Sequence, residues 1–149
     1  KKFLFISSNT VYPEGDNNMT ENDVYNTFYK SYYVVGWMKR FTEIVCDMYS
    51  NKVNNPMQTI IVRPSNLYGP YDKFDWEKSK VIAALIRRAV ETHDPYFVWG
   101  DGNDIKDFLY IEDFIDGIIR ILAIINEYKV INLSSGTSST INDIITTFY

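Results

Sequence analysis

Residues 59–64 read TIIVRP, a short and mostly apolar run that Pro64 ends. A continuous apolar run of this length is typical of a strand buried on both faces, and such strands form parallel sheets that helices cover. Residues 3–7, FLFIS, repeat the pattern near the start of the chain. We therefore expect two buried parallel strands in one sheet.

The residues between these strands predict a helix over 36–49, because Phe41, Ile44, Val45 and Met48 recur at helical spacing. Strand, helix, strand is the crossover unit of doubly wound α/β folds. The same spacing predicts helices over 77–91 and 111–126. We also expect a hairpin around GDGND at 100–104, a short strand within 130–136, and a helix beginning in 139–149.

The composition excludes several classes of protein. A hydrophobic content of 46% argues against disorder, and a net charge of −4 gives no attraction to nucleic acid or anionic membranes. Cys46 and His93 are the only cysteine and histidine, so we expect no metal site. No apolar run approaches the roughly 20 residues of a membrane span. These features predict a cytoplasmic protein.

Polar residues follow both predicted strands. Ser7 and Ser8 end the first strand, and Asn66 follows the second. Ligands of doubly wound sheets bind beyond the carboxyl ends of the strands, where a serine hydroxyl could polarise a carbonyl. Ordinary turns remain an alternative. A basic cluster with Lys80 and Arg88 on the 77–91 helix fits an anionic ligand, or else a solvated basic face.

The order of the longer motifs resembles a known family. SSNTVYP (7–13), RPSNLYGPYDKF (63–74), KVIAALIRR (80–88) and VWGDGNDIKDFLYIEDF (98–114) follow one another along the chain. This order is similar to that of extended short-chain dehydrogenases/reductases. Within them it resembles the NAD(P)-dependent nucleotide-sugar epimerases/dehydratases, most closely the GDP-L-fucose synthases. The resemblance covers residues 3 to about 145.

The resemblance implies an α/β fold, with the later half of a Rossmann-like doubly wound parallel sheet and a smaller mixed α/β substrate-binding lobe. We expect residues 3–69 in the dinucleotide-binding domain. Residues 70–149 are expected mainly in the substrate lobe, with a return to the first domain. No glycine-rich dinucleotide fingerprint occurs among the seven glycines, so we expect the half that carries it to precede residue 1.

The resemblance also implies roles for individual residues. Ser8 matches the group that holds the reacting oxygen of the sugar, and Lys39 matches the lysine that orients the nicotinamide ribose. We expect NAD or NADP to be bound by Ser7, Lys39, Pro64 and Asn66. The nucleotide-diphosphate sugar is expected to contact Ser8, Asn66, Lys80, Arg88, Trp99 and Lys106. Helical spacing, rather than the resemblance, predicts that Arg87 turns toward solvent.

One departure concerns the acid/base group. Val35 stands where the family has a tyrosine, and valine cannot pass a proton. Tyr32 lies seven residues before Lys39, within about 20° of the same face on a regular helix. Gly36 and the valines before it make an irregular helix start plausible. We therefore predict that Tyr32 is the substitute phenol; the alternative is that it only lines the pocket.

These observations predict a nucleotide-sugar epimerase/reductase of the GDP-L-fucose synthase type, homodimeric when intact. Three alternatives remain open. The protein could be a 4,6-dehydratase or 4-epimerase of the same family. It could bind nucleotide sugars without catalysis, because Val35 replaces the tyrosine, or it could be an α/β domain without a small-molecule site.

Overall fold

The computed structural model describes residues 1–13, 15, 18–24, 28, 30–91 and 95–148 of the 149-residue chain. The described residues form a mixed α/β fold with two three-stranded sheets. The first sheet, sheet A, contains β1 (Lys2–Ile6), β2 (Gln58–Pro64) and β5 (Lys129–Leu133) in the order β1-β2-β5. All of its strands run parallel. The two strands expected from the sequence therefore pair as predicted, and the short strand after residue 129 is confirmed.

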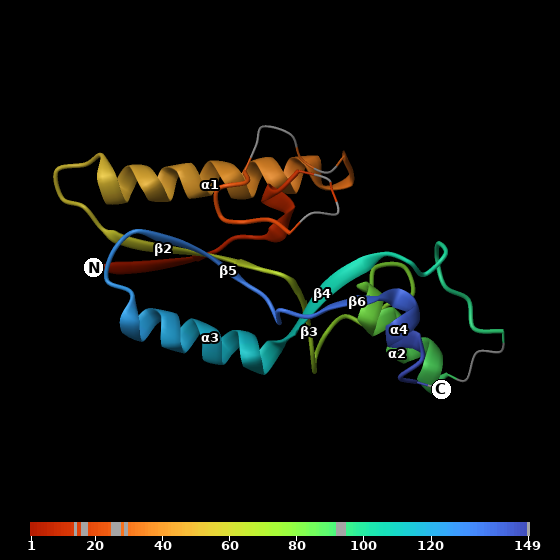
Figure 1. Ribbon diagram of the computed structural model, residues 1–149. Coiled ribbons are helices and arrows are strands. Elements are labelled where there is room, and N and C mark those ends of the chain that lie inside the picture. The colour runs from red at the N-terminus through yellow and green to blue at the C-terminus, as the bar shows by residue number, and fades with distance from the viewer. Residues whose placement is uncertain (14, 16–17, 25–27, 29, 92–94, 149) are drawn as a thin grey trace.

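Two helices cover opposite faces of sheet A, α1 (Tyr33–Asn51) and α3 (Ile111–Ile124) (Figure 1). Because successive side chains of a strand point to opposite faces, β2 contributes to both layers. Ile60 and Val62 belong to the hydrophobic core that includes Phe114 of α3. Arg63 points the other way and contacts Glu43 of α1. This alternation places a charged residue of a buried strand beneath α1.

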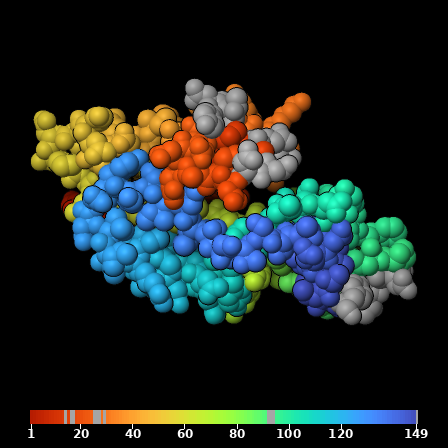
Figure 2. Space-filling model, in the orientation of Figure 1, coloured from red at the N-terminus to blue at the C-terminus, as the bar shows by residue number. Residues whose placement is uncertain are grey.

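The second sheet has the order β3-β4-β6. Its strands are β3 (Asn66–Tyr68), β4 (Ile105–Tyr110) and β6 (Ser138–Thr140); β4 is parallel to β3 and antiparallel to β6. Two further helices, α2 (Val81–Val90) and α4 (Ile141–Ile145), lie beside this sheet (Figure 1). In Figure 2 the C-terminal segment with β6 and α4, in dark blue, lies at the surface of this part of the molecule.

Two details of the predicted elements are wrong. No strand forms in the described residues 95–99, and β4 pairs instead with β3 and β6, which occupy both of its edges. The helix expected from residue 77 begins at Val81. The side chain of Asp75 accepts hydrogen bonds from the backbone N–H groups of Glu77 and Lys78, so that segment forms a turn. Lys80 precedes the helix with an extended backbone.

The expected helices over 36–49 and 111–126 correspond to α1 and α3, and the C-terminal helix corresponds to α4. Thr140 caps α4, because its side chain accepts from the N–H of Asp143 while that carboxylate accepts from Thr140. No helix in the described part of the chain is long and apolar enough to cross a lipid bilayer. The domain boundary near residue 69 stays a prediction.

Candidate active site

The carboxyl end of β1 meets the first half of α1. The Lys39 ammonium donates a hydrogen bond to the backbone carbonyl of Ile6 at 2.9 Å and lies 5.1 Å from the centre of the Phe5 ring. Ile6 is the last residue of β1, and Ser7 and Ser8 follow it directly. The structure therefore brings the predicted catalytic residues Lys39 and Ser8 to the same edge of sheet A.

Ser8 lies at the start of a short 3-10 turn, η1 (Asn9–Val11). Its Oγ accepts from the N–H of Thr10 at 3.2 Å and is 3.3 Å from the amide oxygen of Asn9. The side chain is half-buried. A serine hydroxyl has one donor and two acceptor sites. Here the O–H donates to the Asn9 amide oxygen, so it must turn from Asn9 to donate to the oxygen of a ligand.

The start of α1 packs closely against η1. A Cβ atom added to Gly36 would lie 2.7 Å from the carbonyl oxygen of Thr10 and 2.9 Å from the Phe28 ring. Glycine is therefore required at this contact for steric reasons, and the contact holds the first turn of α1 against the residues that follow Ser8. Val35 immediately precedes this contact and is partly exposed.

Tyr32 belongs to a second 3-10 turn, η2 (Lys30–Tyr32), and precedes α1 with φ −115° and ψ 14°. The irregular helix start expected from the sequence is confirmed. The angular argument for Tyr32 assumed a regular helix through residue 32, however, and α1 begins at Tyr33. That argument does not hold, because a change of helix type alters the rotation per residue. The acid/base role of Tyr32 stays a prediction.

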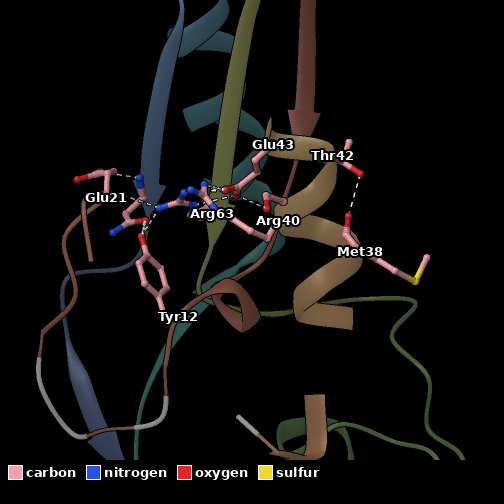
Figure 3. Close-up of polar contacts among 9 residues, drawn as sticks. Tyr12, Glu21, Met38, Arg40, Thr42, Glu43 and Arg63 are labelled. Carbon is pink, nitrogen blue, oxygen red and sulfur yellow. Dashed lines mark hydrogen bonds and ion pairs between the residues drawn. The ribbon is translucent and has the colours of Figure 1, made fainter. Parts of the chain in front are cut away.

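A buried network lies one helical turn beyond Lys39 (Figure 3). The Glu43 carboxylate accepts two bonds from Arg63, from Nε at 2.9 Å and from Nη2 at 2.7 Å. It also accepts from Ser7 Oγ at 2.6 Å and from Arg40 Nη1 at 3.1 Å. Arg63 Nη1 donates to the Tyr12 hydroxyl at 2.9 Å. The network thus joins α1, the end of β1, the central strand β2 and the loop after η1.

The charges of this network are fixed by its contacts. Burial raises the pKa of the Glu43 carboxyl, but the hydrogen bonds from Arg63 and Ser7 outweigh burial and leave that pKa below its ordinary value. Burial lowers the pKa of Arg63, and the bonds to Glu43 and Tyr12 raise it above its ordinary value. Burial raises the pKa of Tyr12. Glu43 and Arg63 are therefore an ion pair, whereas Tyr12 is a neutral phenol.

Sequence reasoning did not select Glu43, Arg63 or Tyr12 as parts of the site. A signal was available, because Arg63 is a charged residue at the end of an otherwise apolar strand, and a buried charge requires a partner. Ser7 was predicted to bind cofactor. In the structure its hydroxyl is buried and donates to Glu43.

The predicted cofactor residues of the second strand lie at the neighbouring strand end. Pro64 is the buried last residue of β2, opposite Leu133 of β5. The Asn66 amide donates to the backbone carbonyl of Asp107 at 2.9 Å, so it joins β3 to β4. Because the N–H of Ser7 donates to the carbonyl of Val62, the ends of β1 and β2 are adjacent. Ser8, Lys39 and Pro64 therefore share one edge of the sheet.

The other predicted substrate residues, Lys80, Arg88, Trp99 and Lys106, belong to the second sheet and the segments beside it. Arg88 Nη1 donates to the carbonyl of Phe97 at 2.7 Å, two residues before Trp99, whose side chain is 86% exposed. Lys80 is exposed at the start of α2, and the Lys106 ammonium on β4 lies 3.7 Å from Asp104. Because Arg88 bonds to Phe97, it lies next to the stretch of chain that carries Trp99.

Arg87 does not turn toward solvent as expected. Its guanidinium lies 4.1 Å from the centre of the Trp76 ring, donates to the carbonyl of Phe74 at 2.6 Å and pairs with Glu91 at 2.8 Å. Stacking of a guanidinium on an indole ring is favourable, and here it holds the loop before α2 against the helix. Arg87 therefore has a structural environment that the helical wheel alone did not reveal.

Two hollows, of about 280 and 350 Å³, lie between α2 and the second sheet. Both are lined by Tyr68 and by Ile82 and Ile86 of α2. None of the predicted site residues lines either hollow. In the described part of the chain, no group of three or more His, Cys, Asp or Glu side chains is placed to bind a metal; His93 lies outside that part.

Comparison with known proteins places these features in a family. Residues 1–134 match the NAD dependent epimerase/dehydratase family. The chain is 31% identical to a GDP-L-fucose synthase of Sinorhizobium fredii, over 91% of this chain and 45% of that protein. It is 29% identical to a probable GDP-L-fucose synthase 1 of Oryza sativa, over 97% of the chain and 45% of the relative. The chain thus spans about half the length of these curated relatives.

Solved structures show the same fold. A UDP-N-acetylglucosamine 4-epimerase from Methanobrevibacter ruminantium matches with a TM-score of 0.83 at 26% identity, over 98% of this chain and 45% of that one. A GDP-L-fucose synthetase from Naegleria fowleri bound to NADP matches with a TM-score of 0.84 at 22% identity, over 99% and 49%. The sheet of β1, β2 and β5 is thus part of a Rossmann-like fold, and the chain belongs to the NAD-dependent epimerase/dehydratase family.

Proposed function

We propose that the intact protein is an NAD(P)-dependent nucleotide-sugar epimerase or reductase of the GDP-L-fucose synthase type. It would transfer hydride between a nicotinamide cofactor and the hexose of a nucleotide-diphosphate sugar. One observation carries the proposal: the Lys39 ammonium is bound to the carbonyl of Ile6, at the carboxyl end of a parallel strand and two residues before Ser8. That edge is where doubly wound sheets bind their ligands.

The residues present fit the nicotinamide end of such a cofactor. An ammonium group has three donors, and Lys39 uses one of them on Ile6, so donors remain for the hydroxyls of a ribose. The cofactor, when bound, supplies or accepts the hydride. We expect the turn that binds its pyrophosphate outside residues 1–149, because the seven glycines contain no dinucleotide fingerprint. Either NAD or NADP is compatible with these residues.

Ser8 would hold the reacting oxygen of the sugar by donating its O–H, which would turn to that oxygen from the amide oxygen of Asn9. The hydroxyl caps η1, and this bond fixes the orientation of Oγ before a ligand arrives. A hydrogen bond to an oxygen on which charge develops stabilises the transition state. In this role Ser8 would act on the substrate carbonyl while Lys39 acts on the ribose.

The nucleotide diphosphate would bind near Arg88, Lys80 and Lys106. The guanidinium of Arg88 has five N–H donors, and its bond to the carbonyl of Phe97 leaves others for phosphate oxygens. The exposed ring of Trp99 offers a flat face to a nucleobase. Relatives named GDP-L-fucose synthase favour a GDP-linked sugar as the first substrate to test.

A second candidate function is binding of a nucleotide sugar without turnover. Val35 favours it, because this position precedes Lys39 by one helical turn and valine cannot transfer a proton. In the catalytic proposal Tyr32 supplies the phenol instead. A Tyr32→Phe variant that loses turnover but still binds the nucleotide sugar would support Tyr32 as the acid/base group, whereas unchanged turnover would exclude it.

We also propose that the intact protein forms a homodimer through α1. Val34, Met38, Phe41, Val45 and Met48 follow one another at spacings of four and three residues, the pattern of a helix that packs against another helix. Four of these five side chains are exposed, on the side of α1 away from sheet A. Phe41→Glu should convert the dimer to a monomer in light scattering, whereas Ile124→Glu on α3 should not. The cytoplasm remains our proposed location.

Turnover tests the central proposal directly. The intact protein is supplied with NADPH and a GDP-linked 4-keto sugar, and Lys39→Met is compared with Lys52→Met, a change at an exposed lysine just after α1. We expect Lys39→Met to lower kcat/KM by about 100-fold or more, as is typical when a proton-transfer system is disabled. Equal activity of the two variants would contradict the assignment of Lys39.

A further inference from the structure

The Glu43 carboxylate is saturated with donors although it lies inside the protein. Its Oε1 atom accepts from Ser7 Oγ and Arg63 Nε, and its Oε2 atom accepts from Arg63 Nη2 and Arg40 Nη1. A carboxylate has about four acceptor sites, so all of them are in use. Glu43, Ser7 and Arg63 are each at most 3% exposed. Four hydrogen bonds from three residues therefore fix the position of this carboxylate.

Two of the groups that Glu43 connects are neighbours of the proposed catalytic residues. Ser7 immediately precedes Ser8, and Glu43 follows Lys39 by four residues, which is about one turn or 6 Å along α1. Two tethers therefore run from one face of α1 to the end of β1: Lys39 to the Ile6 carbonyl, and Glu43 to the Ser7 hydroxyl. The two residues that these tethers reach, Ile6 and Ser7, are consecutive in the chain.

Arg63 adds a connection to β2. Its two bonds to Glu43 form a planar fork, which restricts both the distance and the angle between α1 and the strand. The same guanidinium donates to the Tyr12 hydroxyl and the Glu21 carbonyl. Figure 3 shows these groups pointing toward one another from α1, β2 and the loops. The loop that continues from Ser8 is thus held by the same residue.

We propose that Glu43 is a positioning residue of the active site: by holding the Ser7 hydroxyl and the Arg63 guanidinium together, it fixes the placement of Lys39 relative to Ser8. This inference rests on the proposed function, because Lys39 and Ser8 are the catalytic pair there. Displacement of a catalytic group by about 1 Å can lower a rate about 100-fold, so a tether of this kind affects turnover as well as stability.

A second hydroxyl tether of α1 provides a matched control. Near the other end of the helix, Ser50 Oγ donates to the carbonyl of Met57 at 2.6 Å and lies 2.6 Å from Thr59 Oγ1. Ser7 and Ser50 therefore both join α1 to the sheet through one hydroxyl. Ser50 is eleven residues beyond Lys39, about 16 Å along the helix, and so it is remote from the proposed site.

The experiment compares Ser7→Ala, Glu43→Asp and Ser50→Ala in the intact protein. Glu43→Asp keeps the charge opposite Arg63 but shortens the side chain by one methylene, so that one carboxylate no longer reaches both partners. We expect all three variants to lower the thermal midpoint. Only Ser7→Ala and Glu43→Asp should lower kcat, by about tenfold or more, with KM for the nucleotide sugar changed less than about threefold. Crystal structures should show Lys39 displaced relative to Ser8 in these two variants alone.

The outcomes separate the two proposals. If Ser7→Ala and Glu43→Asp turn over substrate like Ser50→Ala, or if Lys39 and Ser8 keep their places in them, the positioning role is overturned. If the wild-type protein turns over no nucleotide sugar, the proposed function fails. In that case the crystal structures of the two variants test the positioning role by themselves. A displaced Lys39 would support the role of Glu43, and a Lys39 in its wild-type place would exclude it. If either variant cannot be isolated folded, the other gives both readouts.

Discussion

The carboxyl edge of sheet A and the segment from residue 69 to 104 present their polar groups differently. At the edge, Glu43 and Arg63 are buried and bound to each other, and the ammonium of Lys39 is bound to a carbonyl of the same strand end. In the segment, Arg88 binds a backbone carbonyl while Trp99 and Tyr71 face solvent. The proposed catalytic groups at the edge are therefore held in position by the protein itself before any ligand binds. The proposed nucleotide-binding groups in the segment are exposed and can contact a ligand.

The largest expected effect concerns the buried pair. Arg63→Met would leave the Glu43 carboxylate buried without its main partner, and we expect a loss of about 3–5 kcal/mol in the free energy of unfolding. Urea denaturation of the intact protein measures it. The double variant Glu43→Leu/Arg63→Met removes both charges and should recover most of this loss. A single variant as stable as the wild type would show that the pair does not hold the edge.

The next largest effect concerns the solvent-facing segment. Arg88→Ala should weaken nucleotide-sugar binding by about 1.5–3 kcal/mol, the usual loss of a hydrogen bond to a charged group. Arg87→Ala should instead lower stability slightly, because Arg87 stacks on Trp76 and bonds to Phe74. Calorimetric titration and thermal melts measure the two effects. Unchanged affinity in Arg88→Ala would remove Arg88 from the site.

A smaller effect is expected from Gly36→Ala. Alanine is the better helix former by about 1 kcal/mol, but its Cβ would meet the Thr10 carbonyl, and we expect a net loss of about 1–2 kcal/mol. Thr42→Ala on the same helix has no such contact with η1 and should leave stability within about 0.5 kcal/mol of the wild type. Chemical denaturation distinguishes them. A stabilised Gly36→Ala would show that α1 and η1 can separate easily.

The smallest effect is a pH dependence. The pKa of Glu43 in the folded protein lies below its ordinary value of 4.5, so its charge stabilises the fold above about pH 4.5. That contribution is lost as the pH falls through the lower, folded pKa. Stability of the wild type should therefore fall more steeply below pH 4.5 than that of Glu43→Gln. Parallel stability curves would contradict an ionised Glu43.

Much of the fold could be predicted from the sequence, because continuous apolar runs and helical spacing determined the parallel strands, α1 and α3. The predicted hairpin failed because pairing partners are chosen by the tertiary structure: β4 pairs with β3 and β6, which are distant in sequence. The start of α2 was misplaced because the side chain of Asp75 binds the backbone ahead of it. Both errors concern contacts that a local pattern does not contain.

The candidate site was predictable only in part, because some of its residues are brought together by contacts between elements distant in the sequence. Ser8 and Lys39 follow from motif and strand position, and the structure brings them to one edge. The ion pair of Glu43 and Arg63 could not be predicted, because the sequence does not show which strand packs against α1. The angular position of Tyr32 could not be calculated from the sequence, because Tyr32 lies in a 3-10 turn and the α-helix begins only at Tyr33.

A structure of the intact protein with NADP and a GDP-linked sugar tests the proposed site most directly. We predict that Lys39 bonds to the nicotinamide ribose, that Ser8 bonds to the reacting oxygen of the sugar, and that the tether from Glu43 to Ser7 is unchanged. Cofactor and sugar bound away from this edge, for example in the hollow beside Tyr68 and Ile82, would contradict the proposal.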